Sequence, residues 1–364
     1  MKAEELEVET TKAGAEKKTV GIKGPANFWE GVLFLLSRHR ETSIAVIALI
    51  LVIYFQAGSN GGFLTVQFLG VVLRDTSRLG LIAVAEVMLM ITGEIDLSVS
   101  GTFALAPYIM ALMSAVWGTP LALGALVGVG LAVLVGVLNG LITVRFRVPS
   151  LITTVGTLFL LQGFVVSIYN SQPIVIPVQE PFNEIFGESL FDPRGDSLFS
   201  WHGVTAFSPL LWTVLVVAAI AVVLHRTTFG LHTIATGSNL VGAREIGVRT
   251  DRIKVYNFMI AGGFAGFAGI LNTCQFSSAD PAAGGPFLTL QAIAAAVIGG
   301  TSLLGGSGTA VGALIGAFVV ATLNNGLVMM GAQATVSDIY LGAGILAAMI
   351  LNVQVDRLRT RRRI

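Results

Sequence analysis

Residues 92–101 read TGEIDLSVSG, and an apolar run lies on each side of them. The run at 79–91 is LGLIAVAEVMLMI, and the run at 102–117 is TFALAPYIMALMSAVW. Both runs predict membrane helices, because they are apolar and almost free of charge. Between them, Glu94 and Asp96 place two carboxylates beside hydrocarbon, where ionisable side chains are costly and need partners. The stretch therefore predicts a helix that is broken inside a membrane protein.

The break, near 93–100, has local causes in the sequence. Gly93 permits a turn that a side chain would oppose. Asp96 is a good N-cap, because its carboxylate can accept from the amide of Ser98 or Val99 and complements the positive end of the helix dipole. Two interpretations stay open: a structural cap, or a discontinuous helix that forms part of a substrate path or gate.

Glu94 and Glu86 need an explanation other than capping. Glu94 has no obvious capping position and needs a partner or water. Glu86 lies in the middle of an apolar run, where a charge costs roughly 2.5–3.5 kcal/mol on insertion scales. We expect Glu86 to point into the bundle or a wet cavity, either lining a path or making an interhelical hydrogen bond.

The composition fits a membrane protein and excludes several other classes. Of 364 residues, 54% are apolar and only 12% are charged, about half the share of roughly 25% in soluble domains. The net charge of +1 gives no indication of nucleic-acid binding. A single cysteine, Cys274, excludes an intramolecular disulfide and a cysteine metal cluster. We therefore expect an all-α polytopic membrane protein.

Apolar runs of suitable length predict about ten transmembrane helices. They lie near 43–57, 79–92, 101–117, 120–143, 150–169, 209–224, 255–274, 288–304, 309–331 and 338–353. Two internal echoes suggest repeated halves, as in many transporters. GALVG before LNGL resembles GALIG before LNNGL, and ITGEIDLS at 91–98 resembles VIGGTSLL at 297–304.

Lysine and arginine clusters predict the orientation, because they favour the cytoplasmic side. The clusters lie before residue 41, at 145–147, at 225–254 and in the C-terminal RLRTRRRI, and about ten crossings place all of them on one side. The loop at 170–208 holds five acidic residues and faces the other side. Arg74 and Arg78 break this pattern, which raises the alternative that 63–74 is a re-entrant or interfacial piece that belongs to the second segment.

The expected organisation follows from these clusters. Residues 1–25 are polar and resemble neither a signal peptide nor a transit peptide, so the N-terminus is expected in the cytoplasm. The expected parts are a cytoplasmic segment at 1–42, a transmembrane domain at 43–353 with a periplasmic loop at 170–208 and a cytoplasmic loop at 225–254, and a basic cytoplasmic tail at 354–364.

Three motifs carry a resemblance to a known family. The first is formed by Gly93, Asp96, Leu97 and Ser98, the second by GSNLVGAREIGV at 237–248, and the third by the run from 280 to 316 that contains AIAAAVIGGTSLLGGSG. Together they resemble the membrane subunits of bacterial sugar importers of the ATP-binding cassette type, for ribose, xylose or galactose. That superfamily also includes branched-chain amino acid permeases. The second motif departs from the family pattern at 240–242, where Leu-Val-Gly replaces Pro-Glu-Ala.

The resemblance implies that 237–248 is a coupling helix that docks into a groove of an ATPase subunit. The residues expected to couple to the ATPase are Gly237, Ser238, Asn239, Ala243, Arg244, Glu245 and Gly247, and all of these except Ser238 and Glu245 fit the family motif. Ser238 or Asn239 can cap such a helix, and Ala243 with Ile246 would give it one apolar stripe. The plainer alternative is an ordinary cytoplasmic loop.

The sequence predicts no cofactor in this chain and no enzymatic activity. It contains no G-x-x-x-x-G-K-[ST] phosphate-binding motif and no H-E-x-x-H metal motif. The resemblance implies that ATP and Mg²⁺ bind to the separate ATPase subunit. It also implies a periplasmic or lipid-anchored solute-binding protein and a second permease copy, in a homo- or heterodimer in the bacterial inner membrane.

A path for a monosaccharide-like substrate needs sparse polar groups among small and aromatic residues. The candidates are Glu86, Gly93, Glu94, Asp96, Ser98, Phe103, Asn139, Gln162, Gln275, Asn324 and Asn325. The amides among them could instead make interhelical hydrogen bonds, worth about 0.6 kcal/mol each. The surface formed by 170–208 and 276–287 is expected to dock the binding protein, and its acidic excess predicts basic patches on that partner.

Other functions remain open at this point. A permease for nucleosides or branched-chain amino acids is the nearest alternative. An ion-coupled secondary transporter would use the three carboxylates near the break to bind protons or cations. An intramembrane enzyme would need a nucleophile with a base, or a set of metal ligands, and the sequence shows no such set.

Overall fold

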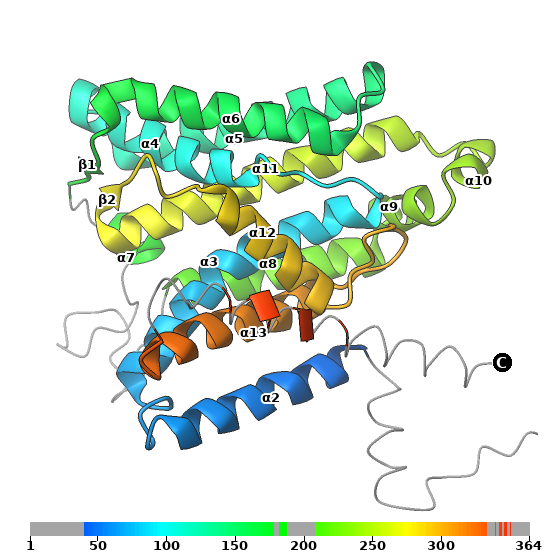
Figure 1. Cartoon of the computed structure of the whole chain (residues 1–364). Helices are drawn as coiled ribbons and strands as arrows, with labels where there is room; N and C mark the ends of the chain where they lie inside the picture. Colours follow the sequence, from blue (N-terminus) through cyan, green and yellow to red (C-terminus); the bar gives the residue numbers. More distant parts are fainter. Residues whose placement is uncertain are drawn as a thin grey trace, which may run out of the picture.

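The computed structural model describes residues 40–177, 182–187 and 208–332, and single positions between 339 and 350. Its elements are α2 (Arg40–Gly58), α3 (Val66–Ile91), α4 (Val99–Trp117), α5 (Leu121–Arg145), α6 (Ser150–Ser167), the 3₁₀ turn η1 (Ile168–Ser171), β1 (Ile174–Val175), α7 (Phe182–Phe186), α8 (Ser208–Arg226), α9 (Thr228–Ser238), α10 (Leu240–Glu245), α11 (Thr250–Phe276), β2 (Ser278–Ala279), α12 (Pro286–Ile298) and α13 (Ala310–Met329). The long helices lie side by side in a bundle (Figure 1).

The predicted all-α membrane fold is confirmed. Within the described residues, seven helices are long and apolar enough to cross a membrane: α2, α4, α5, α6, α8, α11 and α13. Helix α12 is apolar but has only 13 residues, and it ends at Ile298, so the predicted segment 288–304 is too long at its C-terminal end. Gly299 and Gly300 end the helix there, the latter in the left-handed region. The predicted segment at 338–353 lies largely outside the described residues.

Helix α3 is longer than its apolar part. It continues back from the apolar run to Val66 and includes Arg74, Asp75 and Arg78. Asp75 forms an ion pair with Arg78 at 3.3 Å, one turn along the helix, and accepts a hydrogen bond from the Asn325 side chain of α13 at 2.8 Å. Residues 66–74 are therefore the first part of the same helix as the apolar run, as the alternative that attaches this piece to the second segment predicts, and Asp75 and Arg78 are paired along it.

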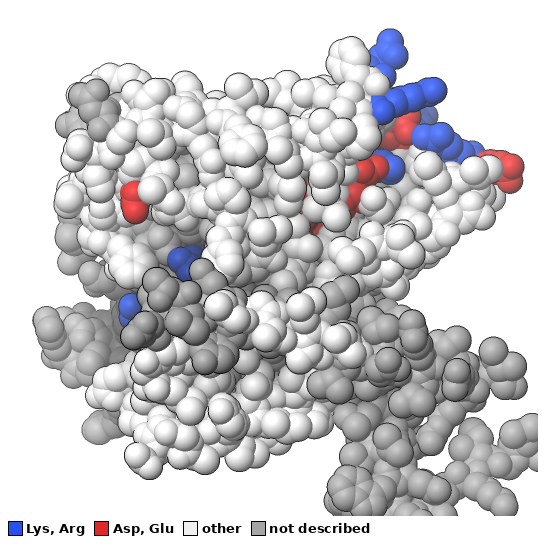
Figure 2. Space-filling model, viewed as in Figure 1, with Lys and Arg blue, Asp and Glu red and all other residues white. Residues whose placement is uncertain are grey.

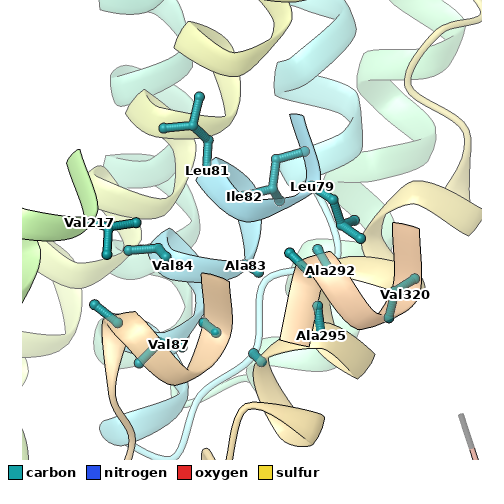
Figure 3. Packing of buried hydrophobic residues seen from close by; sticks show 14 of the residues in the cluster. Leu79, Leu81, Ile82, Ala83, Val84, Val87, Val217, Ala292, Ala295 and Val320 are labelled. Atoms are coloured by element: carbon teal, nitrogen blue, oxygen red, sulfur yellow. The ribbon is translucent and has the colours of Figure 1, made fainter. Parts of the chain in front are cut away.

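The core forms around the apolar part of α3. Residues Leu81–Ala85 and Val87–Ile91 are almost entirely buried. They pack against α8, α12 and α13, including Val217, Ala295 and Val320 (Figure 3). Small residues let the backbones approach closely: a Cβ added at Gly316 of α13 would lie 2.0 Å from the Ala295 carbonyl oxygen of α12.

Six of the helices form two sets of three, α3 to α5 and α11 to α13, which are called the two halves here and make corresponding contacts. In the first half α5 packs on α4, and in the second α13 packs on α12. The last helix of each half also packs against the first helix of the other half: α5 packs on α11, and α13 packs on α3. Helices α3 and α11 run antiparallel, since the C-terminal side of α3 and the N-terminal end of α11 meet at the ion pair of Glu94 with Lys254. This is the inverted-repeat arrangement of many transporters.

Only one of the two sequence echoes follows this repeat. GALVG begins the contact of α5 with α4, and GALIG begins the contact of α13 with α12, through Gly124, Gly128, Gly312 and Gly316. The pairing of ITGEIDLS with VIGGTSLL is wrong as a repeat, because the first break precedes α4 whereas the second follows its counterpart α12.

The two ends of the bundle differ in charge. At one end, called the basic end here, lie Arg145, Arg147, Arg244, Arg252 and Lys254, near α10 (Figures 1 and 2). At the other, called the ribbon end, β1 and β2 form a two-stranded antiparallel ribbon that pairs Ile174 with Ala279. The ribbon joins the two segments that were expected to dock a binding protein.

Candidate functional site

The break between α3 and α4 is held by side chains from a third helix. Helix α3 ends at Ile91, and Gly93 follows with φ of +85°, a conformation that glycine adopts without strain. The freed amides of Ile95 and Leu97 donate to the hydroxyls of Ser150, at 3.3 Å, and Thr154, at 3.0 Å, on α6. Backbone groups inside a membrane protein need such partners, so the chain can leave the helix here.

Asp96 is the centre of a buried polar network. Its Oδ1 accepts from the Ser98 amide at 2.7 Å and from the Ser98 hydroxyl at 2.6 Å. The prediction that Asp96 is the N-cap is wrong, because α4 begins at Val99 with Ser98 as its N-cap, so Asp96 closes a local turn just before the helix. The Asn139 side chain of α5 donates to the Ser98 hydroxyl at 2.8 Å and accepts from Thr157 of α6 at 2.6 Å. Asp96, Ser98 and Asn139 are at most 1% exposed. The network joins α4, α5 and α6 at the break.

Glu86 lies next to this network and is fully buried. Its Oε2 is 3.5 Å from the Asp96 amide nitrogen, and its Oε1 has no hydrogen-bond partner among the described residues. A buried carboxyl oxygen without a partner is costly. Neither apolar packing nor helix capping therefore explains why Glu86 is buried at the break.

Glu94 points away from this network. It forms an ion pair with Lys254 at the start of α11, and both side chains are about 15% exposed. The pair lies on the wall of a cleft of about 890 Å³ at the basic end. Glu94 thus has the partner that the sequence required, and Lys254 was not among the predicted site residues.

The other candidate path residues do not form one group. Phe103 is buried in α4, where its carbonyl oxygen approaches Gly269 of α11. Gln162 donates to the Gly284 carbonyl at 3.3 Å. Gln275 and Asn325 lie toward the ribbon end, Gln275 near Arg74 and Arg78, and Asn325 on Asp75. Asn324 is half-buried on α13.

The predicted coupling stretch, 237–248, contains the last two residues of α9 and the short helix α10, which projects from the bundle at the basic end (Figure 1). Asn239 is the N-cap of α10 and accepts from the Gly242 amide at 2.9 Å, as predicted. The expected stripe of Ala243 with Ile246 is wrong: Ala243 is buried against Val248, but Ile246 is 78% exposed. Helix α10 ends before Ile246, so the helical spacing that would align the two residues does not apply.

Arg244, Glu245 and Gly247 complete this stretch. Arg244 donates to Asp251 at 2.8 Å and to the Thr250 hydroxyl at 2.9 Å, which fixes α10 to the start of α11. Glu245 is exposed, and Gly247 turns the chain with φ of +87°. The tip of α10 thus presents two exposed apolar side chains, Val241 and Ile246.

The base of the coupling stretch touches both breaks in the bundle. A Cβ added at Gly237 would lie 1.7 Å from the Ile91 carbonyl oxygen at the end of α3. That carbonyl accepts from the Gly306 amide at 2.8 Å, in the turn between α12 and α13. The Ser238 hydroxyl donates to the Gly306 carbonyl at 3.4 Å. Three segments far apart in the sequence meet here at backbone contact.

Comparison with known proteins identifies the family. The family described as the permease component of branched-chain amino acid transport systems matches residues 68–349. The chain belongs to this permease family. It is therefore a multi-pass membrane transport subunit and not an enzyme.

The names of individual relatives of this permease state which solute each of them imports. It is 33% identical over 326 residues to the xylose/arabinose import permease of Sulfolobus acidocaldarius, covering 88% of this chain and 86% of that one. It is 33% identical over 322 residues to the autoinducer 2 import permease of Photorhabdus luminescens, covering 88% and 92%. The corresponding protein of Salmonella typhimurium is 32% identical over 323 residues, covering 88% of each. No solved structure matches the chain.

Proposed function

We propose that this chain is the permease subunit of an ATP-driven importer for a monosaccharide or a sugar-like solute. The named relatives import xylose and arabinose, or autoinducer 2, and the break motif GEIDLS resembles sugar permeases. A second permease copy completes the membrane path. A periplasmic or lipid-anchored binding protein delivers the solute at the ribbon end, and an ATPase subunit with ATP and Mg²⁺ binds the basic end. Both termini lie in the cytoplasm of a bacterial cell.

The contact of Gly237 with Ile91 and Gly306 is the main support for this mechanism. A partner that binds the exposed Val241 and Ile246 at the tip of α10 would push on α9. Because Arg244 ties α10 to α11, and Gly237 touches the end of α3 and the turn after α12, a displacement of the tip reaches both halves of the bundle. ATP-driven closure of the ATPase dimer would switch access in this way.

The test uses proteoliposomes that contain the permease, its ATPase and its binding protein, with radiolabelled xylose as the probe. Ile246→Arg places a charge at the apolar tip and is expected to lower both uptake and binding-protein-stimulated ATP hydrolysis at least about 30-fold, the scale of a hot-spot loss of 2 kcal/mol or more. Ile246→Leu is the matched control and should keep wild-type rates. Full coupling in the arginine variant would contradict the proposed role of α10.

Cargo is tested in the same system by competition. Unlabelled ribose or galactose should reduce xylose uptake if the path accepts monosaccharides. Radiolabelled leucine or adenosine should be taken up in place of xylose only if the nearest alternatives, a branched-chain amino acid or nucleoside permease, are right.

The burial of Glu86 favours one second candidate, an ion-coupled secondary transporter. A carboxyl oxygen without a partner in a bundle could bind a proton or cation during transport. Under this alternative, the chain alone would carry solute without ATPase, and Glu86→Gln would abolish the response to an ion gradient. Under the ATP-driven mechanism, Glu86→Gln changes only rate or stability.

A further inference from the structure

The cleft at the basic end is lined by more cationic side chains than carboxylates. It is lined by the end of α5, the link to α6, the start of α11, Glu94 and Arg244. Its cations are Arg145, Arg147, Arg244, Arg252 and Lys254, and its carboxylates are Glu94 and Asp251. We call this site the basic cleft.

Both carboxylates of the basic cleft are already used. Glu94 pairs with Lys254, and Asp251 pairs with Arg244 at 2.8 Å. The three remaining arginines have no carboxylate partner among the described residues. Three uncompensated guanidinium groups around one concave site attract an anion, and their forked donors fit phosphate oxygens well.

A second observation points to a ligand in the same place. Thr143 lines the basic cleft and is 8% exposed, and its hydroxyl has no hydrogen-bond partner among the described residues. Buried hydroxyls are almost always hydrogen-bonded. The hydroxyl oxygen itself is closed to solvent in this side-chain rotamer, so a rotation about χ1 would turn it toward a phosphate oxygen in the cleft.

The remaining wall of the basic cleft is apolar. Leu141 and Val144 on α5, Val148 in the link, and Val255 and Tyr256 on α11 form this wall. Leu141 and Tyr256 are about half exposed, and they lie on helices that are long and apolar enough to cross a membrane. A phosphate that enters beside this wall would have hydrocarbon next to it.

We propose that the basic cleft binds a phosphate group, carried by an anionic phospholipid whose acyl chains lie along the apolar wall of α5 and α11. Basic pockets between membrane helices are suited to such headgroups. The inference concerns the chain alone and does not depend on the ATPase or on the cargo.

The test measures binding of fluorescent phosphatidylglycerol to the full chain in neutral detergent. Arg145→Gln with Arg252→Gln removes two charges from the basic cleft. The matched control, Arg226→Gln with Arg249→Gln, removes two exposed charges near the same end but outside the cleft. At about 5-fold per arginine, the cleft variant should bind about 30-fold more weakly, and the control should stay within about 2-fold of wild type.

A variant that changes no charge tests the site independently of any misfolding caused by the arginine substitutions. Thr143→Val keeps the shape of the side chain and removes the hydroxyl, and it should weaken binding about 10-fold, as expected for a hydrogen bond to a charged group. Fluorescent phosphatidylcholine should bind poorly to all proteins. Full displacement of the labelled lipid by millimolar inorganic phosphate would show that the cleft binds phosphate but that its ligand is a soluble phosphate compound and not a lipid. Equal binding by cleft and control variants, or equal binding of phosphatidylcholine and phosphatidylglycerol, would overturn the proposal.

Discussion

Gly237→Ala tests the contact on which the proposed transmission depends. The added methyl would lie 1.7 Å from the Ile91 carbonyl oxygen. A C···O contact needs about 3.3 Å, so α9 and the end of α3 would have to separate by about 1.6 Å. No side-chain rotation can relieve this overlap, because both elements meet through backbone. The shift would also strain the hydrogen bond from the Gly306 amide to the same carbonyl, which is 2.8 Å long.

The expected loss of stability is about 3 kcal/mol. Overpacking costs roughly 1–3 kcal/mol, and a strained or lost hydrogen bond adds about 1 kcal/mol. Thermal unfolding of the purified protein in detergent, followed by loss of the monodisperse size-exclusion peak, should show a midpoint lower by on the order of 5–10 °C. Gly130→Ala in α5 is the control, because its methyl would meet nothing within 4 Å. If both variants unfold at the same temperature as the wild type, the close contact between α9 and the end of α3 is not as described.

Two further substitutions test the break itself. Asn139→Ala should lower the free energy of unfolding by about 1–3 kcal/mol in the same thermal assay, because it removes the hydrogen bonds that the amide makes with the hydroxyls of Ser98 and Thr157; a change below about 0.5 kcal/mol would mean that the network is dispensable. Glu94→Gln and Lys254→Gln, singly and together, form a double-mutant cycle in which a coupling energy of about 1 kcal/mol is expected for this largely buried ion pair. Additive effects would show that the pair does not contribute.

The parts of this site that follow local rules could be predicted from the sequence. Gly93 and Asp96 indicate a break because a left-handed turn and a turn closed by an aspartate side chain depend on neighbouring residues only. The cap by Asn239 has the same origin. These interactions span at most three residues, so the chain contains all the information they need.

Other features depend on partners far away in the chain. The helical course of α3 through Arg74 is stabilised by Asp75, which pairs with Arg78 and with Asn325, 250 residues away from it. Only the three-residue spacing of Asp75 and Arg78 was visible in the sequence. The apolar stripe predicted for Ala243 and Ile246 failed because α10 ends at Glu245, and the length of a short helix depends on its tertiary contacts.

The contact at Gly237 shows how the inverted repeat and the coupling stretch are related. Ile91 ends the first helix of one half, and Gly306 lies in the turn before the last helix of the other. Their hydrogen bond at 2.8 Å therefore joins the two halves at the basic end. Alternating access in inverted-repeat transporters is largely the rocking of one half against the other, and such a motion must stretch this bond or carry both residues together. Because α9 lies in contact with both residues through a position where only a hydrogen fits, a small displacement of α9 acts directly on the junction between the halves.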